Sequence, residues 1–378
     1  MAEPLDPRPV DPAQVRAAEV VLACDDLDPT LQFFIRLGFR VDAIFPADSP
    51  AVAVLSGHGM ALRLQPLAGA SPGALRLLSD DPALRAGATT ELVAPNGTVV
   101  HIVPADPELV IPELESTFVI DRLAADATFG TGRAGMQYRE LIPGRQGGRF
   151  IGSHIRIPEA GPVPDYVHYH KVRFQMIYCV RGWVRLVYED QGEPFVLRAG
   201  DCVLQPPQIR HRVLEASEGL EVVELGCPAE HETLADHAIS LPTGRLDPDR
   251  DFGGQRFVRH IAADATWGPW RHEGFECRDI GFGAATDGLA GARVVRPVGR
   301  TDRTDHVRHH GELMFGFVLA GSAALEVTGH DPEPVGAGDS FVLPADTTIA
   351  LGACTPDFEL LDVTLPDAVP LTRVPLTR

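Results

Sequence analysis

The chain has 378 residues, more than one hydrophobic core usually accommodates, so two or three domains are expected. Hydrophobic residues make up 44% and charged residues 22%, a balance that is typical of soluble globular proteins. The net charge of −19 argues against nucleic acid and against an anionic membrane surface as partners, because both bind basic patches.

The six cysteines are scattered along the chain without a CxxC pair, which favours reduced thiols over a disulfide scaffold. Residues 1–19 contain neither a basic region nor an apolar one, so no signal peptide is expected. No apolar run approaches the roughly 20 residues that a membrane helix needs. We therefore expect a soluble, cytoplasmic protein without a membrane partner.

Residues 1–105 predict a small α+β domain in which a helix follows the first strand. The expected elements are a strand at 18–26, a helix at 27–38, strands at 39–46, 51–57 and 60–66, and a closing strand at 96–104. This βαβββ order resembles one module of the glyoxalase/bleomycin-resistance (vicinal oxygen chelate) family. A second module of that kind would be shortened between Gly73 and Thr90.

Members of that family take a histidine ligand from the first strand and a glutamate from the last. Here the first strand has no histidine, and His101 stands where the glutamate would fall. The resemblance therefore implies a degenerate module that serves packing or interaction. The acidic, proline-bearing residues 106–119 are expected to form a linker.

The rest of the chain contains an internal repeat. The sequence RLAADATFGTGRAGMQYREL from Arg122 matches HIAADATWGPWRHEGFECRDI from His260, with AADAT identical. The same register places Gly182 on Gly321, and the pair Gly200-Asp201 on Gly338-Asp339. We therefore expect two copies of one module, at residues 120–248 and 249–378.

Each copy consists of short β-branched and aromatic runs separated by Gly, Pro and Asp, with little helical periodicity. Examples are RFIGSHIRIP, QMIYCV, VRLVYED, DCVLQPP and HRVLEAS. Many short strands at regular spacing predict a β-sandwich or a small barrel.

The first copy contains a candidate metal site. His168 and His170 are separated by one residue, so a strand would place both imidazoles on one face. A further histidine, His211, follows the Gly200-Asp201 pair and a Pro-Pro turn, where a neighbouring strand could bring it to the same end of a barrel.

These two motifs resemble those of the cupin superfamily. The resemblance implies a mainly β fold, with tandem double-stranded β-helix (jelly-roll) barrels after the small α+β domain. Carried over by position, the metal ligands are His168, His170, Gln175 and His211. We expect one divalent metal ion per chain, with Fe2+ favoured and with Zn2+, Ni2+, Mn2+ and Cu2+ as alternatives.

Gln175 departs from the family pattern, which has a glutamate at this position. An all-neutral ligand set leaves a divalent ion with its full charge, and so makes it a stronger Lewis acid for an oxygen-rich chelating ligand. The alternative is that the histidines are structural and that Gln175 marks a lost site.

In the same register, the second copy keeps a histidine at one of the four ligand positions. His168 maps to Val307, His170 to His309, Gln175 to Met314 and His211 to Ile349. We expect a structural second barrel that contributes to a homodimer. The alternative is a shifted metal site formed by His306, His310 and Glu312.

Four further residues are candidates for substrate binding, each also explicable as an ordinary surface or core residue: Arg173, Gln205, Arg149 and His154. Alternation along the strand from Gln175 places Ile177 and Cys179 inside the barrel and Tyr178 outside. The site would thus be largely apolar beyond the metal.

The resemblance implies a metal-dependent enzyme that acts on a small enolisable or phenolic molecule, and a non-haem iron dioxygenase is the leading hypothesis. A redox-neutral isomerase or lyase is the alternative within the enzyme class. A non-catalytic protein that binds or senses a small molecule is the alternative outside it, since fold alone does not decide function.

Overall fold

The structure is a computed structural model that describes residues 15–24, 26–36, 38–57, 59–67, 74–80, 90–93, 99–124, 127–299 and 302–375. The segment 1–14, where no signal peptide is expected, and most of the shortened module between Gly73 and Thr90 lie outside these residues. The chain forms two compact units. Unit 1 comprises Met1–Val110 with His231–His237, and unit 2 comprises Ile111–Glu230 with Ala238–Arg378.

Unit 1 has the element order predicted for its first part: β1 (Val15–Ala23), α1 (Leu27–Arg36), β2 (Arg40–Phe45), β3 (Val52–Gly57) and β4 (Met60–Gln65). The strands β5 (Ala74–Ser79), β6 (Glu91–Val93), β7 (Val99–Pro104) and β20 (Thr233–Ala235) complete the sheet, in the order β20-β2-β3-β4-β1-β5-β7-β6. Asp28 lies in the first turn of α1, where a carboxylate interacts favourably with the helix dipole. Among the described residues, no helix is both long and apolar enough to cross a membrane.

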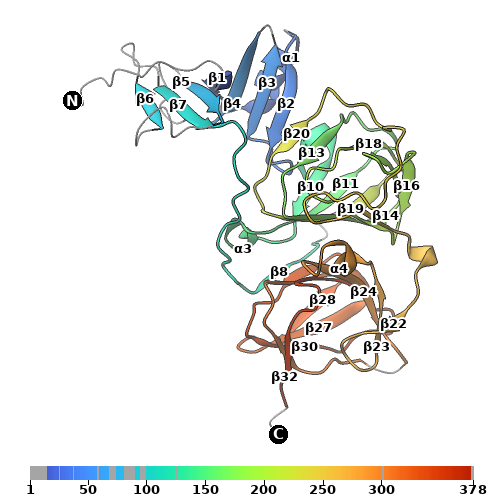
Figure 1. Cartoon of the computed structure of the whole chain (residues 1–378). Helices are drawn as coiled ribbons and strands as arrows, with labels where there is room; N and C mark the ends of the chain where they lie inside the picture. Colours follow the sequence, from blue (N-terminus) through green and yellow to red (C-terminus); the bar gives the residue numbers. More distant parts are fainter. Residues whose placement is uncertain are drawn as a thin grey trace. The chain divides into compact units, whose positions relative to one another are not determined.

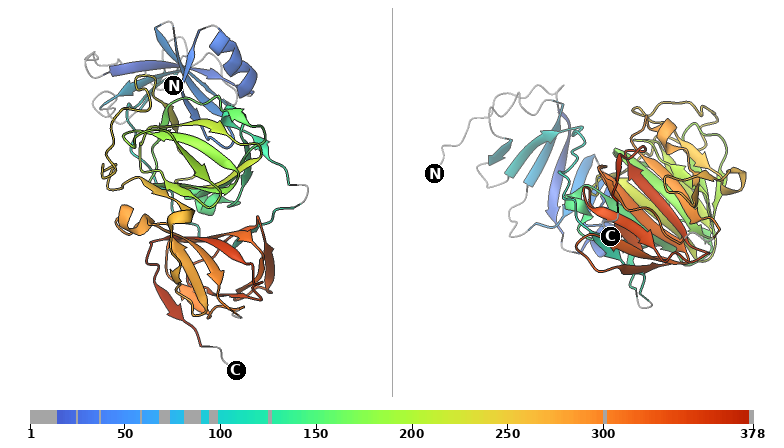
Figure 2. Two further views of the ribbon diagram at one scale, coloured as in Figure 1. Left: turned by 90° about the vertical axis from the view of Figure 1, so that its right-hand side faces the viewer. Right: turned by 90° about the horizontal axis from the view of Figure 1, so that it is seen from below.

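Unit 2 contains two β-barrels, drawn in green to yellow and in orange to red (Figures 1 and 2). Barrel 1 has one sheet with the order β17-β14-β19-β11-β10-β9 and another in which β16, β15, β18 and β13 are neighbours. Its strands are β9 (Gly130–Thr131), β10 (Gln137–Glu140), β11 (Ile151–Ile157), β12 (Gly161–Pro162), β13 (His168–His170), β14 (Phe174–Arg181), β15 (Trp183–Tyr188), β16 (Phe195–Arg198), β17 (Cys202–Leu204), β18 (His211–Ala216) and β19 (Leu220–Cys227).

Barrel 2 repeats this arrangement with sheets β22-β23-β24-β31-β26-β29 and β28-β27-β30-β25-β32. Its strands are β22 (Gly268–Pro269), β23 (Phe275–Asp279), β24 (Gly291–Pro297), β25 (Val307–His309), β26 (Leu313–Ala320), β27 (Ser322–Val327), β28 (Glu333–Gly336), β29 (Ser340–Val342), β30 (Thr348–Gly352), β31 (Glu359–Leu365) and β32 (Leu371–Arg373). The helical segments of unit 2 are short: η2 (Arg133–Gly135), α3 (Arg145–Gly148), η3 (Ala262–Asp264) and α4 (Phe282–Ala285). The fold is therefore the predicted pair of jelly-roll barrels.

The register of the repeat is confirmed by the strand pairing. His168 lies opposite His211 in barrel 1, and Val307 lies opposite Ile349 in barrel 2. The residues that the sequence match placed on one another thus occupy equivalent positions in the two barrels.

The barrels exchange their leading strands. Strand β8 (Val119–Asp121), which precedes barrel 1 in sequence, pairs with β29 of barrel 2. Strand β21 (Val258–His260), which precedes barrel 2, pairs with β17 of barrel 1. Each exchanged strand covers a sheet edge that would otherwise present unpaired backbone groups. The predicted boundaries at 120 and 249 separate the two copies in the sequence. In the folded chain, each copy contributes its leading strand to the barrel of the other copy.

The Gly-Asp pairs of the repeat anchor this exchange. Gly200 has φ of 91°, a left-handed conformation that favours glycine, and it places Asp201 at the turn. The Asp201 carboxylate accepts hydrogen bonds from the backbone N–H of Arg198 in its own barrel and of Ala262 in the other copy. Asp339 makes the same two kinds of bond in barrel 2.

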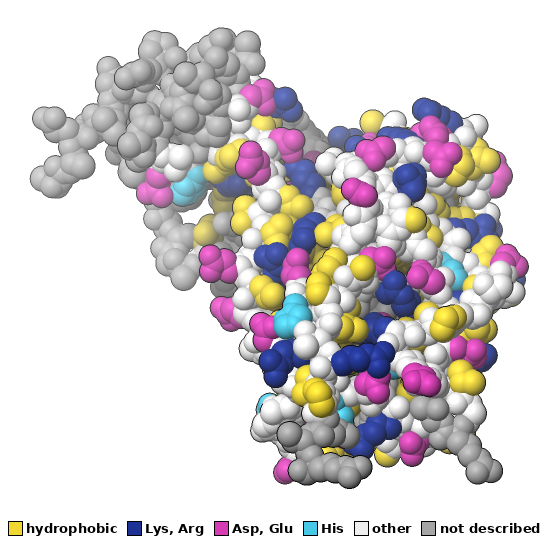
Figure 3. Space-filling model, turned by 60° about the horizontal axis from the view of Figure 1, so that its bottom comes forward, with side chains coloured by type: hydrophobic (Ala, Val, Ile, Leu, Met, Phe, Trp, Pro, Cys, Tyr) yellow, Lys and Arg dark blue, Asp and Glu magenta, His cyan; other side chains and the backbone are white. Residues whose placement is uncertain are grey.

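The two barrels share one hydrophobic core, to which β14, β17 and β19 of barrel 1 and β24, β26 and β31 of barrel 2 contribute. Tyr178 belongs to this shared core, whereas Cys179 and Ile177 belong to the separate core inside barrel 1. The predicted alternation along β14 is thus confirmed. All six cysteines are free thiols. On the described part of the face in Figure 3, acidic and basic side chains are interspersed.

Candidate metal centre

Three histidines converge inside barrel 1. His168 and His170 come from β13, and His211 comes from the first position of β18, directly opposite His168. One nitrogen atom from each imidazole lies within 4.8 Å of the other two, and all three residues are buried. Among the described residues this is the cluster of His, Cys, Asp and Glu that could hold a metal ion.

Backbone carbonyls determine which ring nitrogen faces the cluster. His168 Nδ1 is 2.8 Å from the carbonyl oxygen of Tyr166, and His211 Nδ1 is 3.0 Å from that of Ile209. A carbonyl only accepts, so both Nδ1 atoms carry the proton and donate it. The Nε2 atoms of the neutral rings therefore keep their lone pairs, as metal ligation requires.

Burial keeps these two imidazoles neutral. The pKa of His168 lies well below its usual value because of burial and because of the nearby Arg133 guanidinium. Burial likewise lowers the pKa of His211 to about 4. At neutral pH neither ring needs to lose a proton before it binds a cation, which favours metal binding.

Gln175, the predicted fourth ligand, is buried on β14 and is held by a carboxylate that the sequence did not indicate. Its Nε2 donates a hydrogen bond of 2.5 Å to Oε1 of Glu224 on β19. A carboxylate accepts and does not donate, so this bond fixes the orientation of the amide, and the carbonyl Oε1 is the atom that would serve as the predicted ligand. Glu224 also brings a negative charge beside an otherwise neutral ligand set.

Arg133 is a second residue that sequence reasoning missed. Its guanidinium is buried, forms an ion pair with Asp165 through Nη1, and lies 3.1 Å from His168 Nε2 through Nη2. The Nε atom of Arg133 is buried without a hydrogen-bond partner. A cationic group with unused donor capacity therefore lies next to the three histidines. In the sequence, the alignment of Arg133 with Arg271 in the repeat is the feature that could have identified this residue.

The structure associates one of the four other candidates with the cluster. Gln205 is buried, and its side chain hydrogen-bonds Tyr188, whose ring stacks on His211 with centroids 5.4 Å apart. Its backbone N–H also donates to the carbonyl oxygen of Gln175 at 2.9 Å. Gln205 therefore remains a candidate substrate-binding residue.

The other three candidates have different partners. Arg149 and Arg173 both bind Glu312 of barrel 2, at 2.7 and 2.6 Å. His154 is buried, with Nε2 2.8 Å from Glu221 and its ring against Phe317 of barrel 2. These contacts identify all three as residues of the interface between the barrels. Proximity to the histidine motif in the sequence therefore does not predict the partners of these three residues.

The equivalent positions of barrel 2 do not form a metal site. His309 is buried, its Nε2 donates to the carbonyl oxygen of Leu343 at 2.9 Å, and its Nδ1 accepts from a backbone N–H. The residues of the alternative shifted site have separate partners. His306 pairs with Glu326, His310 with Asp346, and Glu312 with Arg149 and Arg173.

His101 of unit 1 also has an acidic neighbour. His101 Nδ1 lies 3.6 Å from a carboxylate oxygen of Glu91, and both side chains are partly exposed. The expected role of unit 1 in packing or interaction and its relation to a particular family remain predictions.

The residues of barrel 1 fit a divalent transition metal. His168 and His211 are neutral imidazoles with Nε2 lone pairs, and one ring nitrogen of His170 lies within 4.8 Å of both. The amide of Gln175 is oriented by the neighbouring Glu224 carboxylate. Imidazole is a suitable ligand for iron, nickel, copper and zinc. The donor set therefore supports a metal without selecting one.

Comparison with known proteins agrees with the fold. The model of the cupin domain family matches residues 154–225 and 292–362, one segment in each barrel. No curated protein matches the chain. A salicylate 1,2-dioxygenase from Pseudaminobacter salicylatoxidans aligns with 15% identity and a TM-score of 0.50, over 70% of this chain and 90% of that one.

Two further solved structures are similar. Protein Ylba from E. coli aligns with 12% identity and a TM-score of 0.50, over 68% of this chain and 93% of that one. A variant of oxalate decarboxylase from Bacillus subtilis aligns with 13% identity and a TM-score of 0.46, over 71% and 81%. Identities this low concern the fold. The family model matches one segment in each barrel, so each barrel contains a region similar to the cupin domain.

Proposed function

We propose that barrel 1 is the active site of a metal-dependent dioxygenase that acts on a small, anionic, enolisable or phenolic molecule. The observation that carries the proposal is the convergence of His168, His170 and His211 beside a buried arginine. A bound divalent metal would supply Lewis-acid polarisation of a substrate oxygen and, with iron, electron transfer to dioxygen.

The residues of the chain have separate roles in this proposal. Gln175 supplies a neutral oxygen ligand, and Glu224 holds its amide in the required orientation. Arg133 binds the anionic group of the substrate with its unused donors, while Asp165 holds the guanidinium in place. The aromatic ring of Tyr188 stacks on His211 and excludes water from that side.

The experiment measures oxygen consumption with hydroxybenzoates and 1,3-diketones, together with incorporation of labelled dioxygen. We expect one dioxygen per substrate, with both oxygen atoms in the product. His211→Ala removes the activity, and Arg133→Met raises KM more than it lowers kcat. Arg185→Met is the matched control, because this arginine is an exposed residue of β15 that pairs with Glu215.

A redox-neutral isomerase or lyase is the second candidate, and Glu224 is the observation that favours it. A carboxylate held inside the barrel could move a proton at a substrate carbon next to the metal. Substrate conversion under argon without oxygen consumption would support this candidate and contradict the dioxygenase. The absence of any turnover by metal-loaded protein across both assays would contradict both.

A further inference from the structure

The lone pair of His168 Nε2, which a metal ion would need, has a hydrogen-bond partner within the chain. His168 Nδ1 donates its proton to the carbonyl oxygen of Tyr166 at 2.8 Å, so Nε2 is the acceptor atom of this neutral ring. Arg133 Nη2 lies 3.1 Å from Nε2, and a guanidinium only donates. An N–H of Arg133 therefore points at the lone pair that would bind the metal.

The guanidinium and a metal ion exclude each other at this nitrogen. An imidazole nitrogen has a single lone pair in the plane of its ring, so it either accepts the hydrogen bond or binds the metal. A metal ion binds along this lone pair at about 2.0–2.1 Å, within the space that the N–H of Arg133 takes up. Both groups are cations, so they also repel each other. Metal binding to all three histidines therefore requires Nη2 to leave His168.

Asp165 keeps the guanidinium at the site when this bond breaks. Its carboxylate pairs with Arg133 through Nη1 and also accepts the backbone N–H of Val213 at 2.9 Å. The Asp165 side chain is fully buried, so loss of the ion pair would leave a buried charge without a partner, which is strongly unfavourable. Arg133 can instead turn about Nη1, a movement that frees Nη2 and retains the ion pair.

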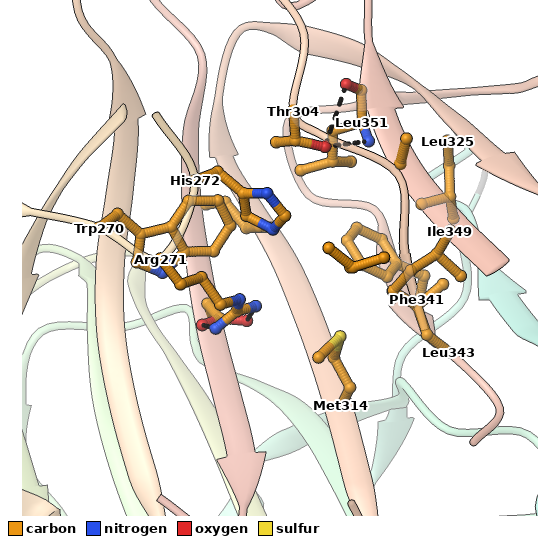
Figure 4. Close-up of a pocket in the computed structure, with 14 residues that line it drawn as sticks. Trp270, Arg271, His272, Thr304, Met314, Leu325, Phe341, Leu343, Ile349 and Leu351 are labelled. Atoms are coloured by element: carbon orange, nitrogen blue, oxygen red, sulfur yellow. Dashed lines mark hydrogen bonds and ion pairs between the residues drawn. The ribbon is translucent and has the colours of Figure 1, made fainter. Parts of the chain in front are cut away.

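The equivalent arginine of barrel 2 shows a second direction for this side chain. Arg271, which the repeat aligns with Arg133, binds both oxygens of Asp362 at 2.6 and 2.7 Å, and its side chain is directed into the barrel interior (Figure 4). Asp362 is the equivalent of Glu224, which lies beside the predicted ligand Gln175 in barrel 1. An arginine at this position of the fold can therefore direct its donors toward the ligand side of the barrel.

We infer that Arg133 and the metal ion compete for His168 Nε2, and that metal binding thereby creates a site for a small oxyanion such as a carboxylate. The freed Nη2 lies on the same edge of the guanidinium as Nε, which is buried without a partner. Two parallel N–H groups on one edge match the two oxygens of a carboxylate. The metal therefore binds before the anion, an order that rests on the metal site proposed for barrel 1 but not on the reaction proposed there.

The test is competition between the full chain and a chromogenic chelator for Zn2+, with and without benzoate as the anion probe. Saturating benzoate should raise the Zn2+ affinity of the unmodified chain at least about fivefold, because coupling between two sites is reciprocal. Benzamide, which is neutral, should have no such effect. Arg133→Met should raise the Zn2+ affinity about tenfold without benzoate, since one charge-assisted hydrogen bond no longer competes, and should abolish the benzoate effect. Arg185→Met is the matched surface control and should change neither quantity.

A second variant covers the case in which Arg133→Met fails to fold. Arg133→Met combined with Asp165→Asn removes both charges of the buried pair, and the amide oxygen can still accept the Val213 N–H. Zn2+ affinity that does not rise in the folded variant, or a benzoate effect that survives in it, would overturn the inference. The reaction proposed for barrel 1 is decided separately, by oxygen consumption of the metal-loaded chain.

Discussion

Barrel 1 and barrel 2 have one backbone and two different interiors. Where barrel 1 places His168 opposite His211, barrel 2 places Val307 opposite Ile349. The exchanged strands and the Gly-Asp turns are the same in both copies. The residues that hold the fold together are therefore separate from those that determine the site, and one barrel can lose its ligands without losing its register.

A strand position inside each barrel sharpens this comparison. Glu224 lies opposite Ile177 on β14, and Asp362 lies opposite Gly316 on β26, at the equivalent place. In barrel 1 the carboxylate accepts a bond from the neutral amide of Gln175. In barrel 2 it forms an ion pair with Arg271. The same carboxylate position thus serves a site in one copy and a structural ion pair in the other.

The largest expected effect is the loss of metal binding in His211→Ala. The variant removes one of the three converging imidazoles, so metal affinity should fall by more than roughly 100-fold. Substitution of a residue that only orients a ligand typically costs less than this. Competition with a chromogenic chelator measures this affinity. Ile349→Ala is the matched change in barrel 2 and should leave metal affinity unchanged. Equal affinity of the two variants would contradict the assignment.

Asp362→Asn should destabilise the protein without affecting metal binding. The Asp362 side chain is 3% exposed, and its loss leaves the Arg271 charge buried without a counter-ion. Breaking such a pair costs about 3–5 kcal/mol in the free energy of unfolding. Denaturant titration measures the change. A variant as stable as the original chain would contradict the structural role of this ion pair.

The stability of the metal-free protein should decrease below pH 6.5, in part because of His272. Burial lowers the pKa of this ring to about 4 in the folded state, so the unfolded chain binds its proton first as the pH falls. The contribution of the neutral His272 ring to the free energy of unfolding is complete above pH 6.5. It is lost progressively down to about pH 4, and the loss is about 3 kcal/mol. His272→Phe should reduce this slope in denaturant titrations at pH 7 and pH 5. An unchanged slope would contradict the burial of a neutral imidazole.

The smallest effect is expected for Glu224→Gln. The variant removes the charge beside Gln175 and the acceptor that fixes its amide, which should weaken metal binding about tenfold. No buried cation is left unpaired, so stability should change less than in Asp362→Asn. The same chelator competition measures the affinity, and Glu215→Gln on the surface is the control. A loss equal to that of His211→Ala would instead identify Glu224 as a ligand.

The sequence predicted the register of both barrels and the histidine cluster, because strand alternation and the repeat place those residues without knowledge of distant contacts. Glu224 was missed because its bond to Gln175 joins residues 49 positions apart, and only the pairing of β14 with β19 brings them together. An acidic residue inside an apolar strand of both copies was the signal that could have found it.

The arginines were harder to place for a different reason. Arg133 lies in an irregular turn, where Ala134 has φ of 55° and strand alternation gives no direction to a long side chain. Arg149 and Arg173 pair with Glu312, which is 163 and 139 residues away in the other barrel. Sequence proximity to the histidine motif could not predict a contact made across two copies of the fold.

The central claim is that only the first of the two equivalent barrels holds a metal. Its most direct test is the metal content of the full chain, purified without oxygen or chelator and measured by elemental analysis. We predict one equivalent of a transition metal per chain. Two equivalents would contradict the difference between the barrels, and metal-free protein that takes up none on titration would contradict the site itself.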